Sequence, residues 1–334
     1  MIELRNLTVS FGSLPVVRGL DLSIFPCEAL GIVGESGSGK SVTWLAVLAL
    51  LPGSARLSGQ ALLAGHNLIG ATEAELARIR GGQIGLIFQD PASALNPVKR
   101  VGSQVVEAIR LHRHLRGSAA REAARRLFEQ VGMPDPARRL DLYPHELSGG
   151  QSQRVMIAMA LAGHPRLLIA DEPTTALDVT IEAQILALLE RLRREMNMAI
   201  VLISHDLSVV GEVCDRIAVM YAGQIVEVAA SSEIFANPAH PYTRGLLAAA
   251  PTLSGRRERL KPIPGHVPEP WNTPPGCAFQ PRCPHAIADC GLAPPPLLAV
   301  ADEHHSRCIR ARVLPPYLHR VPPAPRGQGS GAPA

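Results

Sequence analysis

A glycine-rich loop near the start of the chain has the residue types of a phosphate-binding site. With the residue that follows it, the candidate nucleotide-binding set is Gly34, Glu35, Ser36, Gly37, Ser38, Gly39, Lys40, Ser41 and Val42. The glycines allow successive backbone N–H groups to turn inward and form a nest for phosphate oxygens. Lys40 adds a positive charge, and the Ser41 hydroxyl can ligate Mg²⁺. The spacing therefore predicts that the chain binds a nucleoside triphosphate together with Mg²⁺.

Three short apolar runs precede polar residues that could complete this chemistry. The runs cover residues 29–33, 166–170 and 199–203. Each is typical of a parallel strand that is buried on both faces. The first leads into the glycine-rich loop, the second ends at Asp171 and Glu172, and the third ends near His205. Ligands of open α/β sheets bind at the carboxyl ends of strands, so we expect these residues to converge on the loop.

The chain divides by composition into three regions. Residues 1–237 contain the motifs above, short strands that favour a small antiparallel β subdomain, and a mostly helical subdomain over about 90–163. Phe11 ends the first predicted strand and could either stack on an adenine ring or pack in the core. Residues 238–314 form an extension that is rich in Pro and Cys and shows little periodicity. The tail, 315–334, is rich in Pro, Gly and Ala, which predicts disorder.

Charge and hydropathy exclude several classes of protein. The formal net charge of +4 is too small to indicate a nucleic-acid partner. No apolar run reaches the roughly 18 residues of a membrane span. The N-terminus lacks the uninterrupted apolar region of a signal peptide. We therefore expect a soluble cytoplasmic chain, in which six cysteines do not form disulfides.

The order and spacing of these motifs resemble the ATP-binding subunits of ABC transporters over residues 1 to about 235. Residues 34–41 match Walker A, and Asp171 ends a run that matches Walker B. Gln89 matches the Q-loop, and His205 the switch histidine. The resemblance implies an α/β fold of the P-loop NTPase (RecA-like) class: an ABC nucleotide-binding domain with a small antiparallel β subdomain and a helical signature subdomain.

The resemblance also implies a role for each polar residue. Ser41, Gln89 and Asp171 would hold Mg²⁺, which prefers oxygen ligands. Glu172 would act as the general base that polarises the attacking water. His205 would contact the γ-phosphate and hold that water in line. A histidine at a strand end can also be purely structural, but the companion motifs favour the catalytic role.

Two further motifs imply that the ATP site needs a second subunit. The signature residues are Ser148, Gly149, Gly150 and Gln151. They stand at a predicted helix start, where an anion is favoured, and in the family they face the γ-phosphate bound by the opposite subunit. Read without the family, the same residues form an ordinary helix cap. Asp178 matches the D-loop.

Longer segments narrow the resemblance to the dipeptide and oligopeptide importers, a branch that includes nickel importers. These segments are residues 34–42, 88–91, 95–97, 173–180, 237–238, 240–243 and 262–265. The likeness extends to about residue 310. It implies a peripheral ATPase at the cytoplasmic face of the membrane, two permease subunits, a second ATP-binding subunit that can be a paralogue, and an extracytoplasmic solute-binding protein.

Two alternatives to a peptide importer stay open at this point. One is the same role in the import of nickel or another small solute. The other is a soluble ABC ATPase that acts on nucleic acid or ribosomes. Translation factors of that kind usually carry two cassettes and DNA-repair relatives carry long coiled coils, whereas this chain has one cassette and no heptad run.

Four cysteines in the extension have a spacing that differs from a zinc knuckle. They are Cys277, Cys283, Cys290 and Cys308. Iron–sulfur clusters accept four thiolates at varied spacings. Peptide-importer subunits with the pattern at residues 276–283 resemble proteins that carry a [4Fe–4S] cluster, whereas zinc or unliganded thiols are the alternatives. We expect a structural role for this site, far along the sequence from any ATP motif. Cys27 and Cys214 are expected to be ordinary buried residues.

Overall fold

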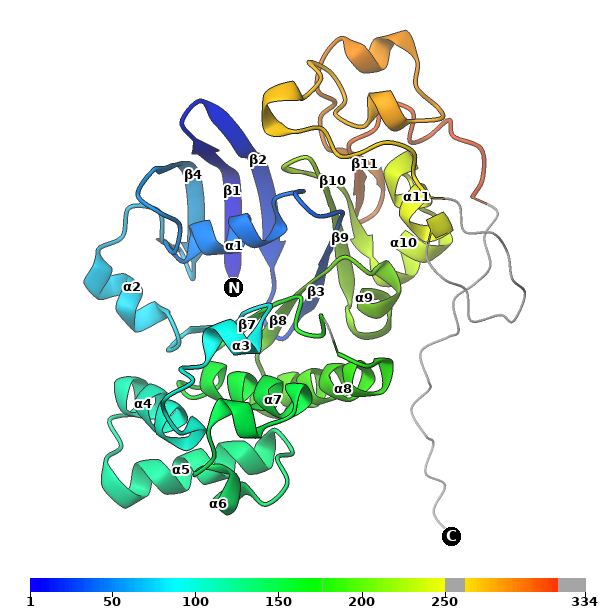
Figure 1. The fold of residues 1–334 in the computed structure, drawn as a ribbon. Helices are drawn as coiled ribbons and strands as arrows, with labels where there is room; N and C mark the ends of the chain where they lie inside the picture. Colours follow the sequence, from blue (N-terminus) through cyan, green and yellow to red (C-terminus); the bar gives the residue numbers. More distant parts are fainter. Residues whose placement is uncertain (176, 250–261, 318–334) are drawn as a thin grey trace.

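The computed structural model describes residues 1–175, 177–249 and 262–317. Its elements form a layered α/β body, a helical lobe and a C-terminal extension (Figure 1). From residue 318 onward, the tail for which disorder is predicted lies outside the described residues. No helix in the described part of the chain has both the length and the apolar character needed to cross a membrane.

The central sheet positions the polar motifs. Within the described residues its strand order is β11-β12-β10-β9-β3-β8-β7-β6. The strands of its main part are β3 (Ala29–Val33), β6 (Ile84–Ile87), β7 (Leu167–Asp171), β8 (Ala199–Ser204), β9 (Arg216–Tyr221) and β10 (Gln224–Ala230). Strands β6, β7, β8, β3 and β9 run parallel, and β10 returns antiparallel to β9. Every residue of β3 and β8 is buried, as the continuous apolar runs predict.

Apolar residues of the central strands alternate between two cores, because successive side chains point to opposite faces. Val201 and Ile203 of β8 face one core, and Ile200 and Leu202 face the other. The first core is closed by α1 (Lys40–Val47) and by a second, antiparallel sheet in the order β2-β1-β4-β5. The strands of that sheet are β1 (Ile2–Phe11), β2 (Leu14–Ile24), β4 (Ala55–Leu63) and β5 (His66–Asn67), and α2 (Glu73–Ile79) follows them.

The second core is closed by helices, most of which belong to the helical lobe. The lobe contains α3 (Pro91–Ala94), α4 (Val101–Arg113), α5 (Gly117–Gln130), α6 (Pro136–Arg139), the 3-10 helix η1 (Pro144–Glu146) and α7 (Gly149–Ala160). Two more helices, α8 (Val179–Met196) and α9 (Leu207–Val213), pack beside the sheet. The buried residues of α8 are Ile185, Leu186, Leu188, Leu189 and Leu192, while Ile181, at the start of the stripe that the helical spacing predicts, is only partly buried.

The extension is more regular than its composition suggests. It contains α11 (Pro241–Ala249), β11 (Leu298–Ala301), β12 (His304–Ser306) and the 3-10 helices η2 (Pro270–Asn272), η3 (Gln280–Arg282) and η4 (Ala288–Gly291), and it follows α10 (Ser231–Ala236). Glu227 and Val228 of β10 pair with Ser306 and His305 of β12, so the extension lengthens the central sheet. Strands this short carry no readable alternation, which is why the sequence analysis missed them.

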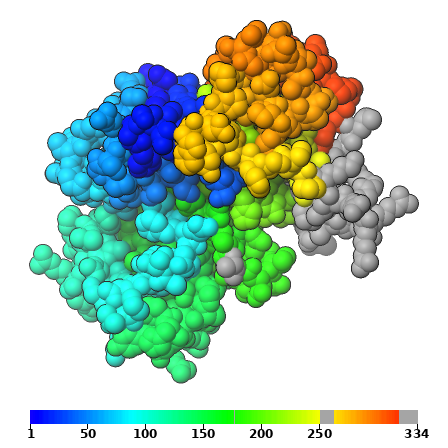
Figure 2. Space-filling model, turned by 45° about the horizontal axis from the view of Figure 1, so that its top comes forward, coloured from blue at the N-terminus to red at the C-terminus, as the bar shows by residue number. Residues whose placement is uncertain are grey.

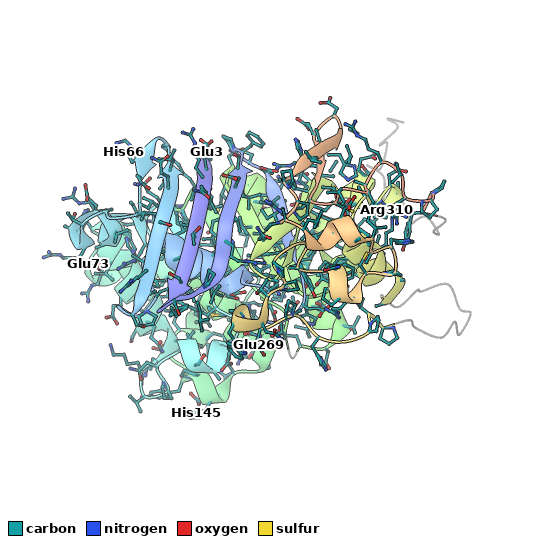
Figure 3. All side chains as sticks on the ribbon, turned by 90° about the horizontal axis from the view of Figure 1, so that it is seen from above. Glu3, His66, Glu73, His145, Glu269 and Arg310 are labelled. Carbon is teal, nitrogen blue, oxygen red and sulfur yellow. The ribbon has the colours of Figure 1, made fainter. Side chains whose placement is uncertain are left out.

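The extension lies beside the N-terminal strands rather than apart from them. In Figure 2 its orange and gold residues adjoin the blue N-terminal segment, and the cyan and green lobe lies on the other side of the molecule. Seen from above, the antiparallel sheet occupies one side, with Glu3 and His66 labelled, and the extension with Arg310 occupies the other (Figure 3). Phe279 of the extension is buried in the same core as Tyr221 and Tyr242. The extension is therefore packed onto the α/β body.

Candidate functional site

The glycine-rich loop turns between β3 and α1 with a backbone that glycine alone suits. Gly37 and Gly39 have φ of 78° and 97°, in the left-handed region that side chains disfavour. A Cβ on Gly34 would lie 2.2 Å from the carbonyl oxygen of Met220. The loop thus packs against the end of β9, with Ser36 and Gly37 exposed at its tip. Strand, loop and helix follow one another as a phosphate nest requires.

Lys40 lies inside this loop. Only 5% of its surface is exposed, and its Nζ donates to the carbonyl oxygens of Gly34 at 2.7 Å and Glu35 at 3.0 Å. Burial lowers the pKa of Lys40, an effect opposed by the carboxylates of Glu172, Asp171 and Glu35. The carbonyl oxygens of Gly34 and Glu35 therefore hold the ammonium group of Lys40 inside the loop.

Parallel register brings the motif residues of three strands to one edge of the sheet. Val33 of β3 pairs with Ser204 of β8, and Asp171 of β7 pairs with Ile203. The Ser41 hydroxyl donates to Asp171 Oδ1 at 2.9 Å. Burial raises the pKa of Asp171, and the hydrogen bond from Ser41 opposes this rise. These two oxygen-bearing side chains are the pair from which a magnesium site could be built.

Three side chains converge on one oxygen of Glu172. Gln89 Nε2 and Thr175 Oγ1 each donate to Glu172 Oε2 at 2.9 Å, and His205 Nδ1 lies 3.5 Å from the same atom. His205 is 64% exposed at its side chain and Glu172 only 18%. The Gln89 amide therefore contacts Glu172 in the structure, whereas its motif predicts a place in the Mg²⁺ shell. The contact from Thr175 is not predicted from the sequence.

The signature residues begin α7 as a capping box. Ser148 Oγ accepts from the Gln151 backbone N–H at 3.4 Å, and Gln151 Oε1 accepts from the Ser148 N–H at 3.2 Å. Ser148 and Gly149 are exposed, while Gly150 lies close to Ile181. No hydrogen bond between described residues joins this motif to the loop at 34–41. Its first turn thus faces solvent within the single chain.

The remaining nucleotide candidates lie at the edges of the site. Phe11 and Val42 are partly buried and pack against the core between the two sheets. Asp178 is exposed at the N-cap of α8, and the neighbouring Val179 is 83% exposed. The adjoining D-loop position 176 lies outside the described residues.

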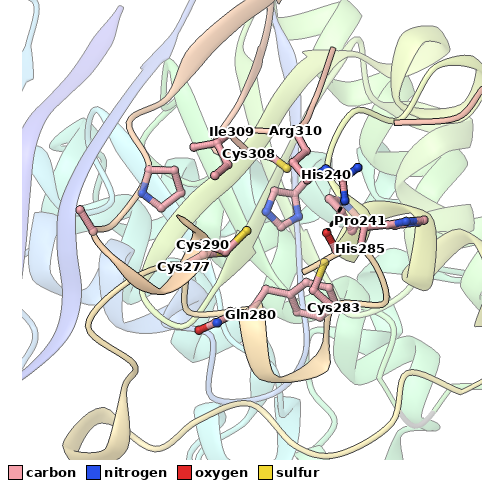
Figure 4. A pocket seen from close by; sticks show the side chains of 13 residues that line it. His240, Pro241, Cys277, Gln280, Cys283, His285, Cys290, Cys308, Ile309 and Arg310 are labelled. Atoms are coloured by element: carbon pink, nitrogen blue, oxygen red, sulfur yellow. Dashed lines mark hydrogen bonds between the residues drawn. The ribbon is translucent and has the colours of Figure 1, made fainter. Parts of the chain in front are cut away.

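The four cysteines of the extension line one small pocket (Figure 4). The cavity is about 20 Å³, and His240, His285 and Phe279 also line it. Burial raises the pKa of Cys277 and Cys283, and it raises the pKa of Cys308 to about 11. Among described residues no three His, Cys, Asp or Glu side chains are placed to hold a metal ion.

The other two cysteines differ from each other. Cys214 is buried, as expected, but Cys27 is exposed, so that expectation is wrong for Cys27. Cys27 occupies a turn between β2 and β3 and has a φ of 59°. Its thiol donates a hydrogen bond to the backbone carbonyl of Asn197.

Contacts from the extension to the glycine-rich loop were not expected from the sequence. Arg282 Nη1 donates to Glu35 Oε2 at 3.0 Å, and the Glu35 backbone N–H donates to Tyr242 Oη at 2.9 Å. Arg282 directly precedes Cys283 in the sequence. The structure therefore brings the cysteine pocket close to the candidate ATP site, although the two are far apart along the chain.

Comparison with known families finds a match in each of two parts of the chain. The family described as ABC transporter matches residues 17–175. The family described as oligopeptide/dipeptide transporter, C-terminal region, matches residues 226–290. The second match covers most of β10 and of the extension, including three of the four pocket cysteines.

Similar proteins resemble the chain over nearly its whole length. A putative peptide import ATP-binding protein of Brucella abortus is 50% identical, covering 92% of this chain and 94% of the relative. The dipeptide transport ATP-binding protein DppD of Escherichia coli is 49% identical, covering 92% and 96%. The oligopeptide transport ATP-binding protein OppD of Escherichia coli is 48% identical, covering 88% and 89%.

Solved structures of similar fold cover about 70% of this chain. The ATP-binding cassette MJ0796, solved as a post-hydrolysis dimer with ADP and Pi, is 29% identical with a TM-score of 0.62. It covers 69% of this chain and 99% of its own. The protein cbiO1 of Clostridium perfringens, part of an ABC transporter complex, gives the same TM-score at 26% identity, covering 70% and 90%.

Proposed function

The chain belongs to the ATP-binding proteins of ABC-type oligopeptide and dipeptide importers, and we propose that it hydrolyses ATP to power uptake of short peptides through a separate membrane permease. One observation carries this proposal: identity near 50% to peptide import ATP-binding proteins runs through both the ATPase region and the extension. The relatives compared above are named for peptides, which favours peptides over nickel.

The proposed ATP site combines the loop at 34–41 with the sheet edge beside it. Backbone N–H groups of the loop and the Lys40 ammonium bind the β- and γ-phosphates. Ser41 and Asp171, already 2.9 Å apart, have the oxygen donors that suit Mg²⁺, with Gln89 as a further candidate. Bound there, the ion neutralises charge on the phosphates. Val42 and the partly exposed ring of Phe11 are proposed to border the nucleotide.

Glu172 is the proposed general base. Its Oε2 is occupied by Gln89 and Thr175, while within the described residues no hydrogen bond reaches Oε1. Oε1 is thus available to accept a proton from water as the water attacks the γ-phosphate. His205, beside Glu172 and largely exposed, is placed to orient that water.

The second half of each ATP site is proposed to come from a partner subunit. The signature residues Ser148, Gly149, Gly150 and Gln151 and the D-loop residue Asp178 would face the partner's nucleotide. Support comes from the exposed first turn of α7, whose N–H groups favour an anion. Because ATP would bind only when the two subunits are closed on each other, ATP binding would drive closure. Hydrolysis would then let the two subunits separate.

The remaining assembly follows from the peptide-importer family. The antiparallel sheet and the helical lobe are the proposed β and signature subdomains of residues 1–237, and residues 238–314 are the importer extension. The chain would act at the cytoplasmic face of the membrane with two permease subunits, a second ATPase that can be a paralogue, and an extracytoplasmic solute-binding protein. No nucleic-acid partner is proposed.

A [4Fe–4S] cluster is the proposed occupant of the cysteine pocket. The donor set fits, since four thiols line one cavity. A single zinc ion, bound by sulfurs at about 2.3 Å, is the alternative occupant. Cys277, Cys283, Cys290 and Cys308 would hold the cluster and thereby tie together a segment with little core of its own.

Uptake by the reconstituted complex tests the peptide proposal. Proteoliposomes containing this chain, its permease subunits and its binding protein should accumulate labelled di- or oligopeptide when ATP is supplied to the ATPase face. Lys40→Ala should abolish uptake, whereas Lys99→Ala, which changes an exposed lysine on the lobe, should not. ATP-driven accumulation of labelled nickel but not of peptides would overturn the assignment.

A further inference from the structure

Arg282 of the extension contacts the Walker A loop, and all three of its guanidinium nitrogens donate hydrogen bonds. Nη1 donates to Glu35 Oε2 at 3.0 Å and to Tyr221 Oη at 3.3 Å. Nε and Nη2 donate to three backbone carbonyls of the extension, those of Ile263, Pro264 and Gly265. The Arg282 side chain is only 6% exposed. Such a contact differs from a surface ion pair, because both the charge and its geometry are fixed by the surroundings.

An aromatic cluster holds Arg282 in this position. The cluster consists of Tyr221 on β9, Tyr242 on α11 and Phe279 in the extension, with ring centroids 4.6 to 5.3 Å apart. The guanidinium carbon lies 5.8 Å from the Tyr221 centroid and 5.9 Å from that of Phe279. Tyr242 contributes a second contact to the loop, since its hydroxyl accepts from the Glu35 N–H at 2.9 Å.

Glu35 is consequently fixed at each of its polar groups. Its side chain bonds Arg282, its N–H bonds Tyr242, and its carbonyl accepts from Lys40 at 3.0 Å. Two of these three partners belong to residues beyond 237. Glu35 also brings a negative charge into a loop that must receive a triphosphate, so an unpaired carboxylate there would oppose binding.

Arg282 also lies on a turn whose neighbouring residues line the cysteine pocket. Phe279, Gln280 and Cys283 line that pocket, and Arg282 lies on the same short turn, η3. The Arg282 N–H donates to the Phe279 carbonyl at 3.0 Å, and the Cys283 N–H donates to that of Gln280 at 3.2 Å. A rearrangement of the pocket that moves η3 therefore moves the guanidinium group.

We propose that Arg282 is a positioning residue for ATP, through which the extension sets the affinity of the Walker A loop. Arg282 pairs with the Glu35 carboxylate, so that this negative charge does not oppose a phosphate in the loop. An ordered extension therefore favours nucleotide binding. The inference rests on the proposed ATP site at residues 34–41. By linkage, ATP must stabilise the turn at 280–283 as much as that turn stabilises bound ATP.

Equilibrium binding of a non-hydrolysable ATP analogue to the purified full-length chain tests this proposal. Arg282→Gln should raise the Kd roughly tenfold, because the Glu35 carboxylate that it leaves unpaired opposes the negatively charged triphosphate. Arg282→Lys keeps the positive charge but loses the several N–H donors of the guanidinium group. Its Kd should lie between those of the wild type and Arg282→Gln. Arg312→Gln is the matched control: Arg312 is an exposed arginine of the extension that bonds the backbone carbonyl of Ala299, and its loss should leave Kd unchanged.

A double-mutant cycle separates positioning from general loss of structure. Glu35→Gln removes the charge that Arg282 neutralises, so Glu35→Gln with Arg282→Gln should bind better than Arg282→Gln alone. In the assembled transporter, KM for ATP should rise in Arg282→Gln with kcat changed less than twofold. Hydrogen exchange of residues 276–291 should slow when the analogue binds the wild type, and not when it is added to Lys40→Ala.

Several outcomes would overturn the inference. They are an unchanged Kd in a folded Arg282→Gln protein, strictly additive effects of the two substitutions, and exchange at 276–291 that is insensitive to nucleotide. Failure of the ATP site itself would look different, because the wild type would then bind no analogue and Lys40→Ala would make no difference.

Discussion

The backbone and the side chain of Glu172 are both held in a fixed orientation. Its backbone φ of 46° lies in the left-handed region, a strained conformation for a residue with a Cβ. Hydrogen bonds from Gln89 and Thr175 fix one carboxylate oxygen, and the Glu172 N–H donates to the Ile203 carbonyl of β8 at 3.0 Å. Strain that the surroundings maintain at the proposed phosphate site favours a functional role for the orientation of this carboxylate.

Glu172→Gln should therefore separate binding from turnover. The variant keeps the shape of the side chain and its contacts but cannot accept a proton, so ATPase activity of the assembled transporter should fall about 10²-fold or more. ATP should still bind, and the closed ATP-bound pair should accumulate because opening waits on hydrolysis. Steady-state ATPase assays and gel filtration with ATP measure both effects. Glu212→Gln, at an exposed glutamate of α9, is the control, and a loss below threefold in Glu172→Gln would remove Glu172 from the role.

At the scale of elements, helix α7 exposes its N-terminal turn to solvent. The capping box satisfies the Gln151 N–H, and the exposed Ser148 and Gly149 mark the face that a partner's γ-phosphate would meet. Gly150 packs near Ile181 of α8, so a side chain there would disturb the junction between lobe and body. The helix start is thus both a fold element and the proposed half-site.

Ser148→Arg should block assembly of the site without blocking nucleotide binding. The long side chain would crowd the γ-phosphate bound by the opposite subunit, so ATP hydrolysis should drop at least about tenfold. The Kd for an ATP analogue on the isolated chain should stay within about twofold of the wild type. Ser118→Arg, at an exposed position of α5, adds the same side chain elsewhere on the lobe and should be active. If an isolated subunit hydrolysed ATP at the full rate regardless of concentration, the composite site would be wrong.

At the scale of the whole molecule, a buried carboxylate joins the extension to the sheet. Glu227 of β10 accepts from the backbone N–H groups of Ala239 at 2.6 Å and His240 at 2.9 Å, and its Oε1 lies 2.8 Å from His304 Nε2. Glu227, His240 and His304 are all buried. One side chain therefore connects β10, the segment before α11, and β12.

Glu227→Ala should release the extension. Removing one partner leaves buried donors unsatisfied, so the free energy of unfolding should fall by about 3–5 kcal/mol. Denaturant unfolding measures the loss, and limited proteolysis should show earlier cleavage in residues 262–317. Glu212→Ala should change stability by less than about 0.5 kcal/mol. Equal stability of Glu227→Ala and wild type would show that the extension docks by other contacts.

The cysteine pocket gives a prediction that also concerns the whole molecule. Protein purified without oxygen should be brown, with broad absorption at roughly 400 nm and about four irons per chain. Cys283→Ser should lose the iron and loosen the extension, whereas Cys27→Ser, at the exposed cysteine, should retain it. Metal analysis and absorption spectra decide the matter, and stoichiometric zinc without iron would favour a zinc site.

The sequence by itself determined the parts of this protein that depend on local chemistry. Glycine spacing, Lys40 and Ser41 predict the loop because positive φ and inward N–H groups are properties of consecutive residues. Apolar runs predict β3, β7 and β8, since strands buried on both faces leave an unbroken signal. The Ser148 capping pattern likewise predicts where a helix begins.

Only the tertiary structure decided which distant groups meet. The hydrogen bond between Arg282 and Glu35 joins residues that are 247 positions apart, and nothing in the sequence around either residue predicts the contact. Strands β11 and β12 are too short to show a period, and they form because the edge of β10 supplies backbone partners. Contacts of this kind depend on packing between layers, which is set by the whole chain at once and not by any stretch of it.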